Sequence, residues 1–219
     1  MIQGVIFDMD GLMLDTEPLW GACWEPVCAK YGYEVPEELP AGVRGLAGDM
    51  MCAALRRYLG DDAPAEEMWE AEKAMGSKLL AQHGAPKKKG LDDLLEYLRG
   101  LMLPLAVASS STKQIIESNL RHAGILEYFD VILSGETLAR SKPDPLIFLE
   151  TAKLLGTRPS RTLVLEDSLN GVEASAAGGF ITVMVPDLVQ PTPQARSHCA
   201  AVVDDLEQVI DLLVSGELG

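Results

Sequence analysis

The chain has 219 residues, 47% of them hydrophobic, which is enough for one large domain or for a domain that carries an insertion. Its 33 acidic and 18 basic residues give a formal net charge of -15, which disfavours nucleic acid as a partner because phosphate backbones bind basic surfaces. No apolar run is long enough to cross a bilayer and no secretory signal is visible, so we expect no membrane partner. The four cysteines form no CxxC pair, which predicts reduced thiols in a cytoplasmic protein.

The first predicted strand runs from Ile2 to Phe7 and leads directly into the segment Asp8-Met9-Asp10-Gly11. This order places two carboxylates at the carboxyl edge of a sheet, where open α/β folds bind their ligands. Carboxylates this close repel each other, so the pattern favours a nearby cation or a shared proton. The alternative is an acidic surface turn that only closes the strand.

The segment that follows, residues 16–86, contains no good strand pattern and is predicted to be helical. Three helices are expected. The first begins at Thr16, which can cap it, with Pro18 in its first turn. The second runs from Asp49 to near Gly60, and the third runs from Pro64 to near His83. We therefore expect an α-helical domain at 16–86 that is inserted into an α/β domain formed by residues 1–15 and 87–219.

Helical patterns separate most of the later strands, as a parallel sheet requires. The predicted strands are Leu103–Ala108, Val131–Leu133, Thr162–Leu165, Ile181–Val185 and Ala200–Val203. Leucines spaced i, i+3, i+4 and i+7 from Leu91 to Leu98 indicate one of the helices. Asp144-Pro145 is typical of a helix start and predicts a helix over Leu146–Leu155 that ends at Gly156.

Three further polar motifs lie at or just after predicted strands: Val107-Ala108-Ser109, Ser141-Lys142-Pro143 and Leu165-Glu166-Asp167-Ser168. Taken singly, they have ordinary explanations as a polar turn, a surface lysine and a helix N-cap. Together with Asp8 and Asp10, and in this order, they resemble the motifs of the haloacid dehalogenase (HAD) superfamily of phosphotransferases. The resemblance is closest to the sugar-phosphate phosphatase and β-phosphoglucomutase branch, and it spans Ile2 to about Leu213.

The resemblance implies an α/β fold with a Rossmann-like, HAD-like parallel sheet core and an inserted α-helical cap domain that closes over the site. Phosphoryl transfer needs a nucleophile, an acid/base and groups that neutralise the phosphoryl oxygens. Asp8 is the candidate nucleophile, and the resemblance implies an aspartyl-phosphate intermediate. Asp10 is the candidate acid/base. The hydroxyl of Ser109 and the ammonium of Lys142 are candidates for phosphate binding.

The resemblance also implies a Mg²⁺ ion, which prefers hard oxygen ligands and retains several waters. Its expected protein ligands are the side chains of Asp8 and Asp167 and the carbonyl of Asp10. Glu166 is expected at the metal site too, holding a metal-bound water. Alternatively, the acids after the strand only favour the N-terminus of the following helix, and both roles can hold together.

The cap should select the substrate, and its candidate contacts are Trp20, Arg44, Gly45 and Lys73, although each charge could equally be a solvated one on a helix. The β-phosphoglucomutase pattern has a His at the position of Trp20 and an Arg near that of Gly48. Both are missing here, which weakens the mutase interpretation. An aromatic side chain at position 20 suits stacking on a sugar face, or packing within the cap.

We therefore predict a Mg²⁺-dependent phosphatase that hydrolyses a small phosphomonoester, a sugar or polyol phosphate, and we expect a monomer. The first alternative is a β-phosphoglucomutase-type phosphotransferase. A second alternative, from another class, is a catalytically idle binding protein on the same fold. The complete set of motif residues argues against this second alternative, because nothing in the sequence requires those residues for folding.

Overall fold

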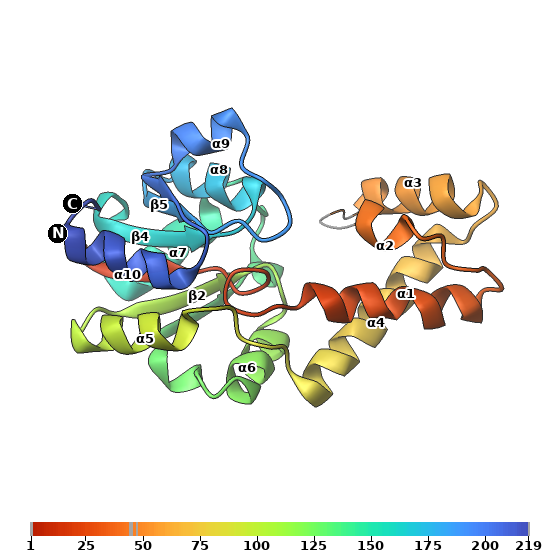
Figure 1. Ribbon diagram of the computed structural model, residues 1–219, viewed down its shortest axis with the longest axis horizontal. Coiled ribbons are helices and arrows are strands. Elements are labelled where there is room, and N and C mark those ends of the chain that lie inside the picture. Colours follow the sequence, from red (N-terminus) through yellow and green to blue (C-terminus); the bar gives the residue numbers. More distant parts are fainter. Residues whose placement is uncertain (1, 44–45, 47, 219) are drawn as a thin grey trace. The chain divides into compact units, whose positions relative to one another are not determined.

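The computed structural model describes residues 2–43, 46 and 48–218, and of Glu17 it describes the backbone alone. The chain forms two compact units, one made of Met1–Asp15 with Ala85–Gly219 and the other of Thr16–Gly84. The sequence placed the second junction two residues later, after residue 86. Figure 1 shows the elements of both units and labels them where there is room.

The first unit, here named the core unit, is built on a six-stranded sheet in the order β3-β2-β1-β4-β5-β6, and every neighbouring pair is parallel. The strands are β1 Gly4–Phe7, β2 Leu105–Ser109, β3 Val131–Ser134, β4 Thr162–Glu166, β5 Ile181–Met184 and β6 Ala201–Val202. Each of these strands lies inside a predicted strand or extends one residue beyond its predicted end. The predicted α/β fold with a Rossmann-like parallel sheet is confirmed.

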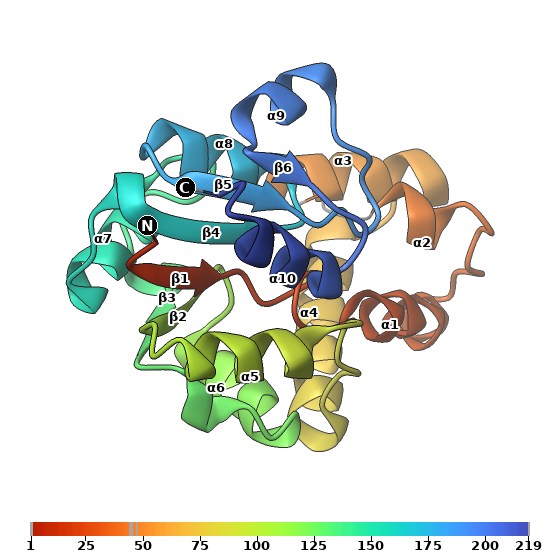
Figure 2. The same cartoon turned by 60° about the vertical axis from the view of Figure 1, so that its left-hand side comes forward.

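Helices cover both faces of this sheet (Figure 2). Because successive side chains of a strand point to opposite faces, Val5 and Phe7 of β1 pack in one apolar cluster while Ile6 packs in another. The first cluster takes in leucines of α5 (Leu91–Gly100) and α10 (Leu206–Ser215), and the second takes in Phe148 of α7 (Leu146–Leu155). The helices of the core unit are α5 Leu91–Gly100, α6 Lys113–His122, α7 Leu146–Leu155, α8 Leu169–Ala177, α9 Pro193–His198 and α10 Leu206–Ser215, with short 3₁₀ turns η1 Leu126–Tyr128, η2 Gly135–Thr137 and η3 Pro159–Arg161.

The strand order reverses at β1, which lies between β2 and β4. In open parallel sheets the carboxyl ends of the strands at such a point flank the ligand crevice. The chain that leaves β1 turns at Gly11, whose φ of 86° is in the left-handed region that favours glycine. The segments that lead to and from the helical unit then pair with each other, since Asp15 N donates to the Pro86 carbonyl and Lys88 N to the Met13 carbonyl, both at 2.8 Å.

The second unit, here named the helical unit, contains α1 Glu17–Lys30, α2 Leu39–Gly42, α3 Gly48–Leu59 and α4 Ala65–His83. Its apolar core joins all four helices through Trp24, Leu39, Leu55 and Met68. The three long helices match the prediction, whereas α2 was not predicted. The prediction that the side chain of Thr16 caps the N-terminus of the first helix is wrong. The backbone of Thr16 is already helical, and its side chain makes no capping hydrogen bond within the described residues.

None of the helices in the described ranges is both long enough and apolar enough to cross a membrane. The four cysteines are free thiols; Cys199 is half-buried and the other three are buried.

Candidate active site

A buried lysine joins two of the predicted carboxylates at the carboxyl edge of the sheet. Lys142 lies on the loop before α7, Asp8 follows β1, and Glu166 ends β4. The ammonium of Lys142 donates to Asp8 Oδ1 at 2.5 Å and to Glu166 Oε1 at 2.6 Å. The side chain of Lys142 is 9% exposed and that of Glu166 is fully buried. Three motifs that are far apart in the sequence therefore form one hydrogen-bonded cluster.

The charges in this cluster shift one another's protonation equilibria. Burial lowers the pKa of Lys142, but the neighbouring carboxylates of Asp8 and Glu166 outweigh it and the net pKa lies above its ordinary value, so the lysine is a permanent cation. Burial, with the charges of Glu166 and Asp10, raises the pKa of Asp8 to about 7 in spite of the opposing effect of Lys142. The site is thus short of positive charge in spite of its lysine.

Asp10 lies beside the serines that follow β2. Its Oδ2 accepts a hydrogen bond from Ser111 Oγ at 2.9 Å and one from Ser109 Oγ at 3.3 Å. Ser109 is almost fully buried and also accepts from the backbone N–H of Ser111. The sequence singled out Ser109 and missed Ser111, because a run of three serines has no periodicity that says which hydroxyl faces the acid. The two serines fix the orientation of the Asp10 carboxylate.

Glu166 is held on both of its oxygens. Oε1 accepts from Lys142, and Oε2 accepts from the backbone N–H groups of Asp167 and Ser168 at 3.0 Å and from Ser168 Oγ at 2.9 Å. Ser168 also caps α8, since its hydroxyl accepts from Gly171 N. Because Glu166 is fixed in this way, it holds the ammonium of Lys142 in position. The expectation that Glu166 holds a metal-bound water remains a hypothesis.

Gly171 is a second residue that sequence reasoning missed. A Cβ at this position would lie 1.9 Å from the Glu166 carboxyl group, so only glycine leaves room for that side chain. We expect Gly171→Ala to lower the free energy of unfolding by about 2 kcal/mol, because displacing a fixed buried carboxylate outweighs the roughly 1 kcal/mol that alanine gains in helix propensity. Urea unfolding would measure this.

The matched control for that prediction is Gly100→Ala in α5, where a Cβ would meet nothing within 4 Å. It should leave the stability unchanged or raise it slightly. Equal effects of the two substitutions would contradict the role given to Gly171.

Asp167 lies against the loop that carries the first two acids. A Cβ on Gly11 would lie 2.3 Å from Asp167 Oδ2, so the carboxylate packs on the glycine backbone. Burial, with the charges of Glu166 and Asp8, raises the pKa of Asp167 to about 9. Asp8 and Asp167 thus offer two hard oxygen ligands that repel each other, which fits a Mg²⁺ ion. Within the described residues no three His, Cys, Asp or Glu side chains form a ligand set by themselves, so a backbone carbonyl and waters would have to complete the coordination.

These raised pKa values predict how the metal-free protein responds to pH. A carboxyl group whose pKa in the folded protein lies above its unfolded value of 3.8 binds more protons when folded, so its contribution to the stability of the folded state is complete at low pH. That contribution is lost as the pH rises through about 7 for Asp8 and about 9 for Asp167. In EDTA, the melting temperature should therefore fall between about pH 6 and pH 9. A smaller fall is expected with Mg²⁺, since a cation neutralises the same carboxylates. A melting temperature that rises over this interval in EDTA would contradict the prediction.

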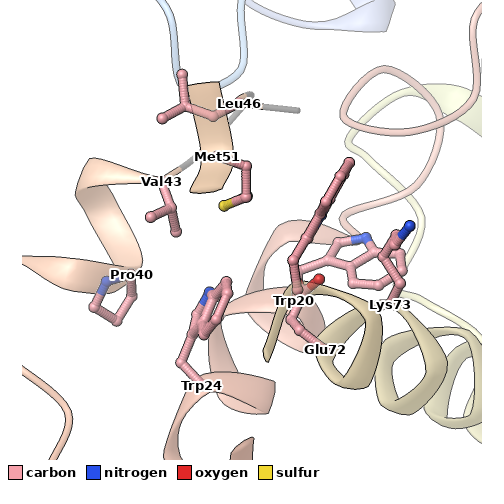
Figure 3. Close-up of a pocket in the computed structure, with 10 residues that line it drawn as sticks. Trp20, Trp24, Pro40, Val43, Leu46, Met51, Glu72 and Lys73 are labelled. Carbon is pink, nitrogen blue, oxygen red and sulfur yellow. The ribbon is translucent and has the colours of Figure 1, made fainter. Parts of the chain in front are cut away.

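The substrate contacts that were expected in the cap domain divide into two groups. Trp20 and Lys73 lie together in the helical unit, where both line a pocket (Figure 3). Arg44 and Gly45 fall outside the described residues. The same pocket is lined by Trp24, Trp69 and Glu72, which the sequence did not single out because they lie at ordinary helical spacings.

The fold and the site are those of an α/β enzyme that gathers carboxylates, a buried lysine and serine hydroxyls at the edge of a parallel sheet. The model of the haloacid dehalogenase-like hydrolase family matches residues 5–185 of the chain. The chain belongs to this family, and it is a phosphoric monoester hydrolase.

Two relatives and one solved structure illustrate the similarity. A phosphorylated carbohydrates phosphatase of Thermotoga maritima is 31% identical over 183 residues, which cover 82% of each chain. Hexitol phosphatase B of Escherichia coli is 30% identical over 208 residues, or 94% of this chain and 91% of that relative. A crystal structure of β-phosphoglucomutase from Clostridium difficile has a TM-score of 0.75 and covers 100% of this chain and 97% of its own, at 23% identity, and so shows the shared fold.

Proposed function

We propose that this enzyme hydrolyses a small phosphomonoester, a sugar or polyol phosphate, in a Mg²⁺-dependent reaction that passes through an aspartyl phosphate on Asp8. The observation that carries the proposal is the position of Lys142, whose ammonium lies 2.5 Å from Asp8 Oδ1 and is fixed from its other side by Glu166. A fixed cation next to a carboxylate nucleophile is suited to receive the negative charge of a transferring phosphoryl group. The two phosphatase relatives, named for phosphorylated carbohydrates and for hexitol, support the substrate class.

The proposed reaction has two steps. In the first, a carboxylate oxygen of Asp8 attacks phosphorus, the bond from phosphorus to the ester oxygen breaks, and Asp10 gives its proton to the leaving alcohol. In the second, Asp10 takes a proton from a water molecule, whose oxygen attacks the same phosphorus. This step releases orthophosphate and restores Asp8 and the protonated Asp10.

The remaining side chains position and neutralise the reacting groups. Ser111 and Ser109 hold the Asp10 carboxylate by hydrogen bonds, so that its proton is available at a defined place. Lys142 offsets the charge on the phosphoryl oxygens, and Glu166 keeps Lys142 there. Asp8 and Asp167, with the Asp10 carbonyl, would hold a Mg²⁺ ion, which supplies additional positive charge for the phosphoryl oxygens.

The test is phosphate release from a panel of sugar, polyol and nucleoside monophosphates, measured with Mg²⁺ and with EDTA. The proposal predicts turnover with Mg²⁺ on at least one sugar or polyol phosphate and its loss in EDTA. Conversion of β-glucose 1-phosphate into glucose 6-phosphate with little phosphate release would instead indicate a mutase. No reaction with any member of the panel by a folded protein would contradict the proposal and leave the idle binding protein.

A further inference from the structure

The helical unit contains a pocket of about 220 Å³ that is lined by residues from all four of its helices. The chain has three tryptophans, and all three, Trp20, Trp24 and Trp69, line this pocket. In Figure 3, Pro40 and Val43 lie on one side of the hollow and Trp20, Glu72 and Lys73 on the other. Because a whole residue type is gathered at one place, the pocket needs an explanation beyond ordinary packing.

The aromatic walls are held in place before any ligand binds. Trp24 is 2% exposed and belongs to the apolar core of the unit. Trp20 lies against α4 at Gly76, where a Cβ would approach a ring atom to 2.0 Å. The missing side chain at position 76 therefore creates the space in which the Trp20 ring lies. Preformed concave walls of this kind are typical of small-molecule sites.

Two charged side chains of opposite sign accompany these rings. Glu72 is 6% exposed, and its charge adds to the effect of burial in raising the pKa of the Cys23 thiol. A carboxylate has about four acceptor positions, so Glu72 can accept a hydrogen bond from a ligand in addition to its contacts within the protein. The ammonium of Lys73 lies 4.1 Å from the centre of the Trp69 ring and is paired with Glu70 at 2.6 Å. Among the described lining residues, Glu72 supplies an acceptor and Lys73 a donor.

These features discriminate between classes of ligand. Flat apolar walls favour a flat ring, which can stack on an indole. A free sugar would bury several hydroxyls against walls that are mainly apolar, at a cost for each hydroxyl left without a partner. A cationic ligand would approach the ammonium of Lys73, which already lies over one of the indoles. An uncharged heterocycle with both N–H and C=O groups on its edge meets neither penalty.

We propose that the pocket of the helical unit binds an uncharged, nucleobase-like heterocycle, which stacks on the indole rings, donates an N–H to Glu72 and accepts a hydrogen bond from Lys73. The proposal goes beyond the proposed function, and a sugar phosphate that carries such a base would satisfy both. Binding of the base can be measured without any phosphate group, so failure of this proposal is distinguishable from failure of the proposed function.

The tryptophans provide the measurement, since their fluorescence reports on this pocket alone. The full chain is titrated with uridine, with excitation at the long-wavelength edge of indole absorption, where uridine does not absorb. We expect a saturable change with uridine and none with glucose or choline at the same concentrations. Glu72→Gln should weaken uridine binding by about tenfold or more, since a charged acceptor is lost from a buried site. Glu67→Gln, at an exposed position of the same helix, should leave the affinity unchanged.

Several results would overturn the proposal. These are the absence of a saturable change with uridine, a change with glucose or choline in its place, or equal affinity for uridine in the parent and in Glu72→Gln. Circular dichroism shows whether Glu72→Gln is folded. If it is not, Gly76→Ala provides the second test, because a Cβ at position 76 must displace Trp20. That variant should also bind uridine more weakly, and unchanged binding by a folded Gly76→Ala would count against the proposal.

Discussion

Asp8→Asn is expected to abolish phosphate release from every substrate of the parent enzyme. An amide nitrogen or oxygen cannot take the place of the carboxylate that attacks phosphorus, so the rate should fall by at least about 10⁴-fold, as it does when other enzymes lose a nucleophile. The fold should survive, because asparagine has the same shape and its oxygen can still accept from Lys142, which lies 2.5 Å from Asp8 Oδ1 in the parent. The measurement is phosphate release with Mg²⁺, with circular dichroism to show that the variant is folded.

The matched control for this prediction is Asp92→Asn, which removes an exposed carboxylate of α5 that pairs with Lys87. It should keep the rate of the parent. If the folded Asp8→Asn protein released phosphate at a rate close to that of the parent, Asp8 would not be the nucleophile.

Lys142→Met is expected to impair both stability and activity. The lysine separates two carboxylates in a buried place, with Asp8 at 2.5 Å and Glu166 at 2.6 Å. Without it, those groups must ionise unpaired or bind protons, so we expect a loss of about 3 kcal/mol in the free energy of unfolding. Activity should fall by about 10² to 10³-fold, as when an enzyme loses one group that stabilises the transition state. Urea unfolding and steady-state kinetics measure the two effects.

The control for the lysine is Lys153→Met on α7. Lys153 is 75% exposed and its pair with Glu150 lies at the surface, so stability should change by less than about 0.5 kcal/mol. An Lys142→Met protein as stable and as active as Lys153→Met would show that the buried cation has no role in the site.

The strands and long helices could be predicted because their patterns are local. Apolar runs such as Thr162–Leu165 are short and continuous, as buried parallel strands are, and the helix Leu146–Leu155 is marked by Pro145 before it and Gly156 after it. The four-residue helix α2 was missed because it is too short to show any periodicity. The side-chain cap at Thr16 was wrong because propensity does not reveal that the helical backbone already includes this residue.

The site was predictable only in part, for a physical reason. The motifs identified Asp8 and Glu166 because one follows a strand and the other ends one, and a parallel sheet brings the ends of its strands to one edge. Lys142 lies on the loop before α7 and was identified only by the resemblance of Ser141-Lys142-Pro143 to a family motif. The supporting contacts have no such signal. Gly171 is required by the volume of a side chain five positions earlier, and the choice among three serines depends on the turn after β2.

The pocket of the helical unit could not be predicted from the sequence either. Trp24 and Trp69 lie in different helices at positions that apolar core residues also occupy, so only the packing of the helices reveals that they share a cavity with Trp20. From the sequence, Trp20 and Lys73 were separate candidates for substrate contact, and the structure shows that they line the same pocket.

The central claim is that Asp8 receives the phosphoryl group. A single-turnover experiment tests it most directly, with enzyme in excess over a phosphate-labelled substrate, Mg²⁺ present, and acid quenching at successive times. The account predicts label that is bound transiently to the protein, is found on the peptide that contains Asp8, and appears before free phosphate. Label on a different peptide, or free phosphate that forms at the full rate in Asp8→Asn, would contradict it.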